Sequence, residues 1–353
     1  MLTKSRYSVL DMLRWTRIHL RNFALYALVV VALFDLLDLR FLRIPWAPVA
    51  VLGTAVAFIV GFQNNAAYGR IWEARKIWGG ILNRSRTLGI QIQDMVTNEY
   101  AKEPVSEEAL KRERKILLHR HLAWVTSMRH AMRQPRPWEE FHNEQTNREW
   151  SDAVCIPERV VGHDDDLNDY LSPEEAASVL RRRNAPSAIL ELQSKHLRRL
   201  KEQGLVWEFS FLELQAQLKD LLDLQGASER IKNFPYPRQY ATLSHQFVWL
   251  FILCLPFATL PEFAKLGDQL SETYPKIAPA FVWLAVPFCT LIAWIFHTML
   301  RIGRVGENPF EGSANDVPIS TMSRTIEIEV LQMLGADPGE IPDPIPELKS
   351  VQM

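Results

Sequence analysis

The feature that most constrains the fold is an uncharged run from Ile44 to Gly69, which continues without a break into the charged segment Arg70–Lys76. The run is longer than the roughly 20 apolar residues that a helix needs to cross the hydrocarbon core of a bilayer. Gln63, Asn64 and Asn65 lie in its inner third. Amide side chains at membrane depth usually face other protein or water. The sequence therefore predicts a membrane-spanning helix that lines a wet space.

Three other segments are also long and nearly free of charge, although 23% of all residues are charged. With the first run they give four predicted membrane-spanning helices, over about 23–39, 44–69, 239–261 and 277–300. The first of these contains Asp35 and Asp38 near its outer end. No small-residue cleavage site follows it and a second span comes at once, which argues against a signal peptide.

Between the second and third spans lies an insert of about 70–238, and a Pro-rich tail covers 336–353. The insert shows helical and no strand periodicity, and Ser106 and Ser172 stand before acidic residues as at helix starts. We therefore expect an all-α protein with an extended or disordered tail. Since spans on both sides of the insert must pack against it, residues 1–353 are expected to form one unit.

Basic residues gather in the N-terminal segment, at the start of the insert and after the fourth span. These three regions lie on the same side of the predicted membrane. Loops rich in Lys and Arg stay on the cytoplasmic side. Both termini and the insert are therefore predicted to be cytoplasmic.

Within the second span, Thr54, Phe58 and Phe62 recur every four residues and so share one helical face. Three small residues occupy a neighbouring face at the same spacing: Gly53, Ala57 and Gly61. Small residues allow close approach of helices, and a ring of such helices with Phe inward can gate by dewetting. The alternative is that the aromatic residues face lipid or a neighbouring helix, as apolar residues at helical spacing commonly do.

Three segments follow one family pattern. The first reads GFQNNAAYGRIWEARKIWG and begins at Gly61. The second reads ENPF over 307–310, followed by NDVP at 315–318 and RTIE at 324–327. A looser match is ERI at 229–231 with Pro235. In this order and at these distances the segments resemble the bestrophin family of ion channels, particularly its prokaryotic members, over nearly the whole chain.

The resemblance implies a homopentamer with one axial pore, in which the five second helices form a narrow apolar neck above a cytoplasmic vestibule. By position the neck residues are Thr54, Phe58 and Phe62, with Asn64 and Asn65 bordering the neck on its cytoplasmic side. The outermost neck residue of the family is usually aliphatic. Thr54 departs from that pattern, so the outer end of this neck is expected to be wetter.

The resemblance also implies two cytoplasmic features. One is a second apolar constriction, for which Ile189 is the candidate; packing of Ile189 inside a helix interface is an equal alternative. The other is the acidic cluster at which animal members of the family bind calcium. Here only Asn308 and Asp316 remain as oxygen ligands at matching positions. Because calcium takes roughly six to eight oxygens, we predict no tight calcium gating, and we expect no other metal and no cofactor.

Two other classes of protein stay open. A membrane-anchored, metal-dependent enzyme would use His and Asp residues of the insert, where His163 beside Asp164–Asp166 is the best metal candidate on paper. An acidic, solvated loop is the simpler interpretation of that segment. A scaffold would bind a partner protein through the insert and tail. The sequence has no nucleophile elbow, phosphate-binding glycine loop or HExxH motif, so we expect no catalysis.

The combined prediction is a channel for small monovalent ions in a bacterial inner membrane, with other copies of the chain and lipids as partners. A net charge of −1 gives no indication of nucleic-acid binding. The neck is uncharged, so charges at the mouths should set the sign of the ion. Asp35 and Asp38 would attract cations, whereas the Arg-rich inner helices and the positive edges of Phe rings would attract anions. We expect anions such as chloride; a sodium- or potassium-selective channel is the alternative.

Overall fold

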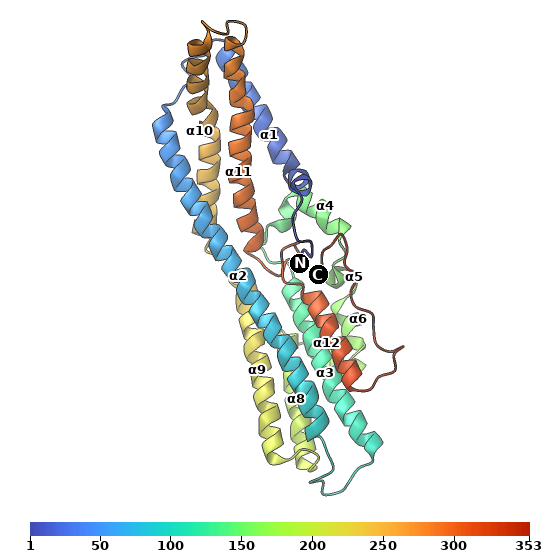
Figure 1. Ribbon diagram of the computed structural model, residues 1–353. Coiled ribbons are helices and arrows are strands. Elements are labelled where there is room, and N and C mark those ends of the chain that lie inside the picture. The colour runs from blue at the N-terminus through green and yellow to red at the C-terminus, as the bar shows by residue number, and fades with distance from the viewer.

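One helix, α2 (Trp46–Met95), runs through most of the length of the molecule and joins its two halves (Figure 1). The structure is a computed structural model that describes residues 1–353. At 1.5 Å per residue α2 is about 75 Å long, more than twice the thickness of a bilayer core. Its two halves therefore lie in different surroundings.

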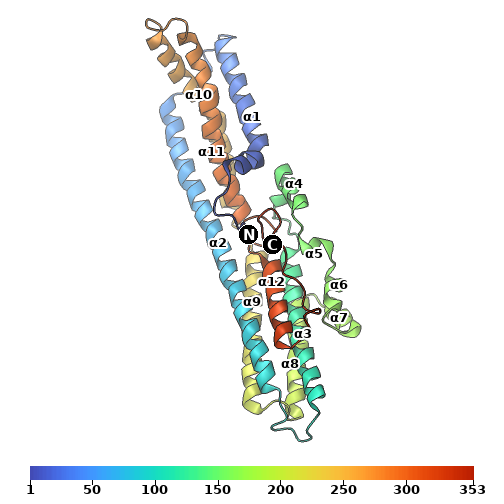
Figure 2. The same cartoon turned by 45° about the vertical axis from the view of Figure 1, so that its right-hand side comes forward.

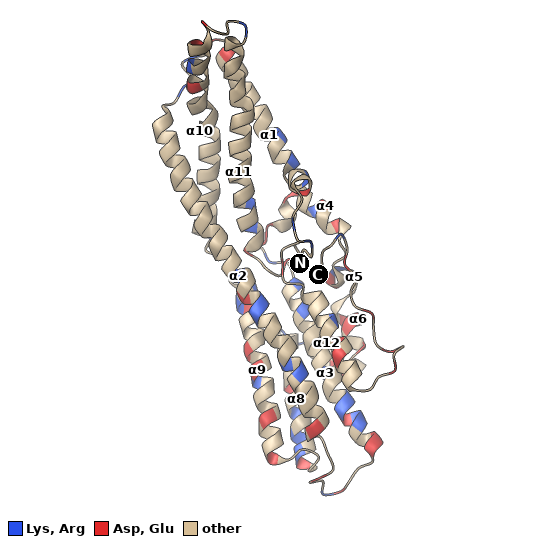
Figure 3. Cartoon of the chain, viewed as in Figure 1, with Lys and Arg blue, Asp and Glu red and all other residues tan.

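The upper half of the molecule in Figure 1 is a bundle that we call the apolar bundle. It consists of the first half of α2 with α1 (Val9–Asp35), α10 (Arg238–Leu270) and α11 (Ala285–Gly306). A short 3-10 helix, η2 (Ala278–Leu284), leads into α11. Charged side chains are sparse here except near the ends of the helices (Figure 3).

Four helical stretches are long and apolar enough to cross a membrane, which confirms the predicted number of spans. They are Val9–Asp35, Trp46–Met95, Glu208–Leu270 and Ala278–Gly306. Two prolines, Pro256 and Pro261, lie inside α10 without ending it. Such prolines are tolerated in membrane helices, because neighbouring helices and local adjustments satisfy the freed backbone groups.

The lower half, which we call the charged body, surrounds the second half of α2. Four helices build it: α3 (Glu107–Arg133), α8 (Ala185–Glu202), α9 (Glu208–Asn233) and α12 (Ile319–Met333). Their apolar faces enclose the largest core of the protein, in which the side chains of Trp78 and Trp124 are fully buried. Lys, Arg, Asp and Glu recur along the helices of this half (Figure 3).

Short helices line one side of the charged body (Figure 2). They are η1 (Phe141–Asn143), α4 (Gln145–Ala153), α5 (Pro157–Val160), α6 (His163–Asn168) and α7 (Pro173–Leu180). Ser106 and Ser172 cap α3 and α7 by accepting hydrogen bonds from Ala109 N (3.2 Å) and Glu175 N (3.3 Å), which confirms both predicted helix starts. The segment that follows His163 is helical, not the solvated loop that we expected.

The tail beyond α12 contains no helix, as its prolines predict, but its end is packed against the protein. Val351 and Met353 are buried with Val154 and Ile156, and Leu2 forms an antiparallel bridge with Val351. The two chain ends therefore meet where the apolar bundle joins the charged body (Figures 1 and 2).

Candidate functional site

One face of α2 is left uncovered by the rest of the chain. Phe58 is 65% exposed and Phe62 is 72% exposed, and Thr54 is exposed on the same face. The opposite face, with Val56 and Val60, is buried against α10 and α11. Packing within the subunit therefore does not explain the two phenylalanines; a second copy of the chain, lipid or a pore must cover them.

Small residues on α2 divide between the buried and the exposed faces. Gly53 is buried, and a Cβ there would lie 2.7 Å from Cε2 of Phe251 on α10. Gly61 has no other atom within 4 Å of its Cβ position. The sequence placed both residues in one small-residue face for contacts between subunits. In the structure only Gly61, with Ala57, stays free for such a contact, because Gly53 accommodates α10 of its own chain.

The three consecutive amides of α2 point in different directions, since successive helix residues are rotated by about 100°. Asn65 is exposed on the same side as Phe62. Gln63 is buried and donates from Nε2 to Glu307 Oε1 over 2.9 Å. Asn64 is turned toward α11, where its Oδ1 would lie 2.3 Å from a Cβ placed on Gly303. The side chains of Asn64 and Asn65 therefore lie on different faces of α2. The buried position of Gln63 is explained by its hydrogen bond to Glu307 in the same chain.

The uncovered face of α2 continues below the apolar bundle. Tyr68 is 62% exposed and Trp72 is 52% exposed, and their rings stack with centroids 6.5 Å apart. Sequence reasoning missed both residues as part of this face. Their spacing from Phe62 and Asn65, three or four residues at a time, is the signal that could have found them. We call the set Thr54, Phe58, Phe62, Asn65, Tyr68 and Trp72 the exposed α2 stripe.

Arg70 fixes the orientation of this stripe where the two halves of the molecule meet. Its Nε donates to Glu307 O over 2.6 Å, and its Nη2 donates to Ile231 O and Phe234 O over 2.9 and 3.0 Å. These three carbonyls lie at the ends of α11 and α9. The guanidinium therefore ties α2 to both helices and is not free to bind an ion.

Ile189 packs inside a helix interface, which is the alternative that the sequence left open, and does not lie at a constriction of the single chain. Ile189 is fully buried in the core of the charged body, because α8 turns its apolar positions toward α3. Exposed apolar side chains occur instead at the start of α9, where Phe209 is 62% exposed and Leu212 is 56% exposed. The same helical spacing of apolar residues occurs in a buried core and at an exposed constriction, so the sequence could not distinguish these two positions.

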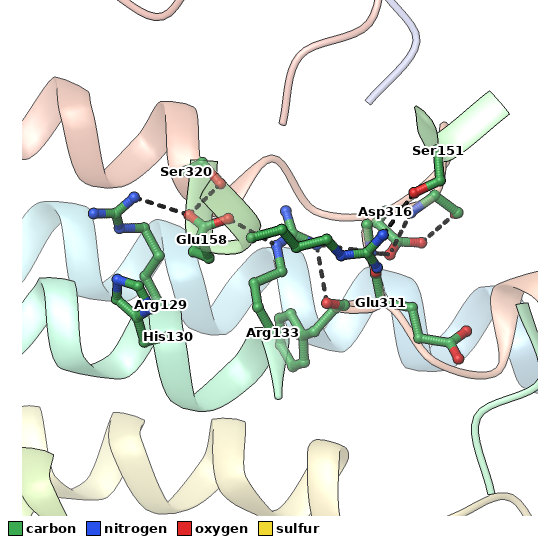
Figure 4. Close-up of polar contacts among 12 residues, drawn as sticks. Arg129, His130, Arg133, Ser151, Glu158, Glu311, Asp316 and Ser320 are labelled. Carbon is green, nitrogen blue, oxygen red and sulfur yellow. Dashed lines mark hydrogen bonds and ion pairs between the residues drawn. The ribbon is translucent and has the colours of Figure 1, made fainter. Parts of the chain in front are cut away.

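A buried ion cluster joins α3 to the segment after α11 (Figure 4). Arg133 Nε lies 3.5 Å from Glu158 Oε2, and its Nη1 lies 4.0 Å from Asp316 Oδ2. Arg129 and Ser320 donate to Glu158 Oε1 over 2.9 and 2.6 Å. The side chains of Arg133 and Glu158 are 3% and 0% exposed, so both charges depend on these partners.

The cluster occupies the position of the degraded calcium site. Asp316 accepts hydrogen bonds from Gly312 N (2.6 Å), Ser313 N (3.0 Å) and the Ser313 hydroxyl. Burial raises the pKa of Asp316 above its usual value, and these donors together with Arg133 oppose the shift. Asn308 adds no ion-pairing group. The carboxylate of Asp316 therefore already has its donors and a fixed cation nearby.

The acidic segment that begins at His163 also finds its partners within the chain. His163 is hydrogen-bonded to Ser127 Oγ (3.0 Å) and stacks on His130 with centroids 4.9 Å apart. Asp166 pairs with Arg129 (2.7 Å) and His130 (2.6 Å). Burial lowers the pKa of His163 to about 4, so it is neutral near pH 7. No group of three or more His, Cys, Asp or Glu side chains is arranged to hold a metal ion.

Glu311 is a second buried carboxyl group near the cluster. Burial, then the charges of Glu139 and Asp316, raise the pKa of Glu311 to about 8, with Lys232 opposing the shift. Its Oε1 has no hydrogen-bond partner. The folded protein therefore holds this carboxyl protonated at neutral pH, whereas the unfolded chain ionises it near its ordinary value of about 4.3.

We predict that Glu311 contributes stability that is lost as the pH rises from about 5 to 8, because over that range the folded state keeps a proton on this carboxyl that the unfolded state has released. His163 acts in the opposite direction below its unfolded pKa of about 6.5, since burial lowers its pKa to about 4 in the folded protein. Glu311→Gln, which is permanently neutral, should lack the Glu311 contribution, so its stability should fall less toward pH 8 than that of the original protein. The measurement is the unfolding temperature of detergent-purified protein at a series of pH values. Parallel profiles for the variant and the original protein would show that Glu311 does not titrate in this way.

Comparisons with known proteins agree with this architecture. A family model described as Bacterial/Fungal Bestrophin protein matches residues 6–271 and 274–332. The voltage-dependent anion channel-forming protein YneE of Escherichia coli is 27% identical over 323 residues, which cover 92% of this chain and 87% of that protein. Its Salmonella typhimurium counterpart is 26% identical over 316 residues, covering 89% and 84%.

Solved structures show the same fold. A bacterial bestrophin homologue from Klebsiella pneumoniae superposes with a TM-score of 0.69 at 23% identity, over 91% of this chain and 99% of that one. At this level of identity the likeness extends to the fold alone. The four apolar helices, among them the long α2, therefore have an arrangement that is already known from experiment.

Proposed function

This chain belongs to the bacterial and fungal bestrophin family, and we propose that it forms a homopentameric channel that passes small monovalent anions such as chloride across a membrane. The observation that carries the proposal is the exposed α2 stripe, which presents Phe58 and Phe62 on a surface that the chain itself does not cover. The names of the YneE relatives, which are anion channel-forming proteins, favour the anion.

Five copies of α2 around one axis would place Phe58 and Phe62 in two successive aromatic rings. An apolar ring of this kind limits ion passage by dewetting. Thr54 would form a more polar ring at the outer end, and its hydroxyl bonds to Ala50 O (3.0 Å). Asn65 would border the neck below Phe62. Asn64, which faces α11, supports the neck and does not line it.

The charged body would surround a vestibule below the neck, on the cytoplasmic side with both termini. Because α2 belongs to both halves, residues 1–353 would act as one unit, with the spans in the helices described above and the tail 336–353 bound to the body. Phe209, which is exposed at the start of α9, replaces Ile189 as our candidate for a second constriction.

The outer ends of the helices offer no clear attraction for cations, which weakens the sodium or potassium alternative. A hollow of about 660 Å³ at this end is lined by equal numbers of opposite charges. They are Asp35, Glu262 and Asp268 against Arg40, Arg43 and Lys265. Asp38 is paired with Arg40 at 2.6 Å, and Asp35 accepts a hydrogen bond from Trp283 Nε1 (2.9 Å). Anion preference would then come from the basic inner helices.

The proposal is tested by reconstituting the purified protein in a planar bilayer, where it should carry a current without added calcium. We place the channel in a bacterial inner membrane, with lipids and other copies of the chain as its partners. A scaffold or a membrane-anchored enzyme predicts no current. The internal pairing of His163 and Asp166 offers such an enzyme no open metal site.

A further inference from the structure

A cavity of about 1000 Å³ opens on the charged body, away from the exposed α2 stripe. It lies between the end of α3, the turn that joins α7 to α8, and the last turns of α9. Its charged lining consists of three arginines, Arg136, Arg182 and Arg183, and one carboxylate, Glu229. From these residues we infer that the cavity is a binding site for a phosphate group carried by a small molecule or a lipid.

The cationic side chains of the cavity are short of partners. Arg182 reaches Glu191 only at 3.4 Å and at an exposed site, and Arg136 and Arg183 form no ion pair within the chain. Glu229, whose Oε1 accepts from Asn184 Nδ2 (2.9 Å) and Gln225 Nε2 (2.8 Å), offsets only one of the three positive charges. The cavity therefore has an excess of positive charge.

Two buried donors around the cavity also lack an acceptor. They are Nε of Arg136 and the indole Nε1 of Trp138, both without a hydrogen-bond partner. Buried donors without an acceptor are unfavourable and are normally satisfied by protein, water or a ligand. His163 supplies no further charge, since it is neutral and bonded to Ser127. Both atoms have almost no accessible surface, so an anionic ligand would reach them only after a small shift of the Arg136 and Trp138 side chains.

The N-terminus of α8 adds a fixed dipole to the same wall. Ala185 and Pro186, the first two residues of this 18-residue helix, line the cavity. The partial positive charge at such an end favours anions. An arginine guanidinium can donate two parallel N–H bonds to two oxygens of one phosphate group. The cavity is larger than a bare phosphate, and Met132, Pro137 and Leu180 form an apolar part of its wall. An organic group attached to the phosphate would fit against them.

The position allows two sources for the phosphate. The backbone carbonyl of Trp138 accepts a hydrogen bond from Arg238, the first residue of α10, so the cavity lies near the start of a membrane-candidate helix. A lipid headgroup could reach it there, as basic pockets at the cytoplasmic face commonly bind such headgroups. A soluble phosphorylated compound could enter from the aqueous side. Both use the same donors.

The test uses the full-length protein in neutral detergent and phosphate-free buffer, and measures its unfolding temperature. One arm titrates pyrophosphate; the other titrates short-chain phosphatidylglycerol, with phosphatidylcholine for comparison. We expect a saturable rise in at least one arm. A rise in one arm alone identifies the source of the phosphate, and a rise in both shows that the site accepts the group from either source. Arg183→Gln alone, at an exposed residue, and Arg136→Gln with Arg183→Gln should each weaken the response, the double variant by about tenfold or more.

Arg181→Gln is the matched control, because Arg181 belongs to the same run of arginines, is exposed and does not line the cavity. Its titration curves should coincide with those of the unchanged protein. The inference is overturned if neither pyrophosphate nor phosphatidylglycerol gives a saturable response. It is equally overturned if Arg183→Gln and Arg181→Gln respond alike. Neither readout depends on ion conduction, so this result is independent of the proposed channel activity.

Discussion

Replacing Phe58 and Phe62 by alanine should raise ion flux through the reconstituted protein several-fold. If both side chains line the narrowest part of an uncharged pore, their removal widens the neck and makes it easier to wet. The fold of one chain should tolerate the change, because the side chains are 65% and 72% exposed and fill no intrachain cavity. The measurement is anion efflux from liposomes loaded with chloride, at equal amounts of incorporated protein.

Phe288→Ala is the matched control for that experiment. Phe288 is also an exposed aromatic residue of a membrane-candidate helix, at 51% exposure, but it lies on α11 and away from the exposed α2 stripe. Its removal should leave the flux unchanged. If the double variant at Phe58 and Phe62 conducts no better than Phe288→Ala, neither phenylalanine lines the neck. This conclusion does not depend on the number of subunits in the channel.

Replacing Arg133 by methionine should destabilise the protein by about 3 kcal/mol. Breaking one partner of a buried ion pair costs about 3–5 kcal/mol, since it leaves a charge without compensation. We expect the lower end of that range because Arg129 stays 2.9 Å from Glu158 and three donors stay on Asp316. The loss is a large part of the 5–15 kcal/mol that stabilises a typical domain.

The unfolding temperature of the purified variant measures this loss, and Arg84→Met provides the comparison. Arg84 pairs with Asp220 at 2.9 Å, but the side chains are 43% and 37% exposed. An exposed pair contributes at most about 1 kcal/mol. Adding Glu158→Gln to Arg133→Met should restore part of the stability, because it removes a buried carboxylate that then has Arg129 as its one cationic partner. Equal losses for Arg133→Met and Arg84→Met would contradict the role of the cluster.

The helices of this protein could be predicted because their signals are local. Membrane-candidate helices follow from long runs without charge, and the starts of α3 and α7 follow from Ser106 and Ser172 with the acids behind them. Periodicity likewise placed Phe58 and Phe62 on one face of α2. None of these inferences requires knowledge of what a helix packs against.

The remaining features depend on contacts between distant parts of the chain. Whether Phe58 is buried or exposed depends on which face of α2 meets α10 and α11. The sequence could not decide between a core position and a constriction for Ile189, because an amphipathic helix shows the same pattern whether its apolar face meets a core or a pore. The ion pairs of Arg133 with Glu158 and Asp316 join residues that are far apart in sequence, and no local pattern marks them.

The most direct test of the channel proposal is the reversal potential of the purified protein in a planar bilayer under a potassium chloride gradient. An anion channel reverses near the equilibrium potential of chloride, and this is the result that we predict. Reversal near the potassium potential would contradict the anion preference while leaving a channel. The absence of any current from correctly assembled protein would contradict the channel itself.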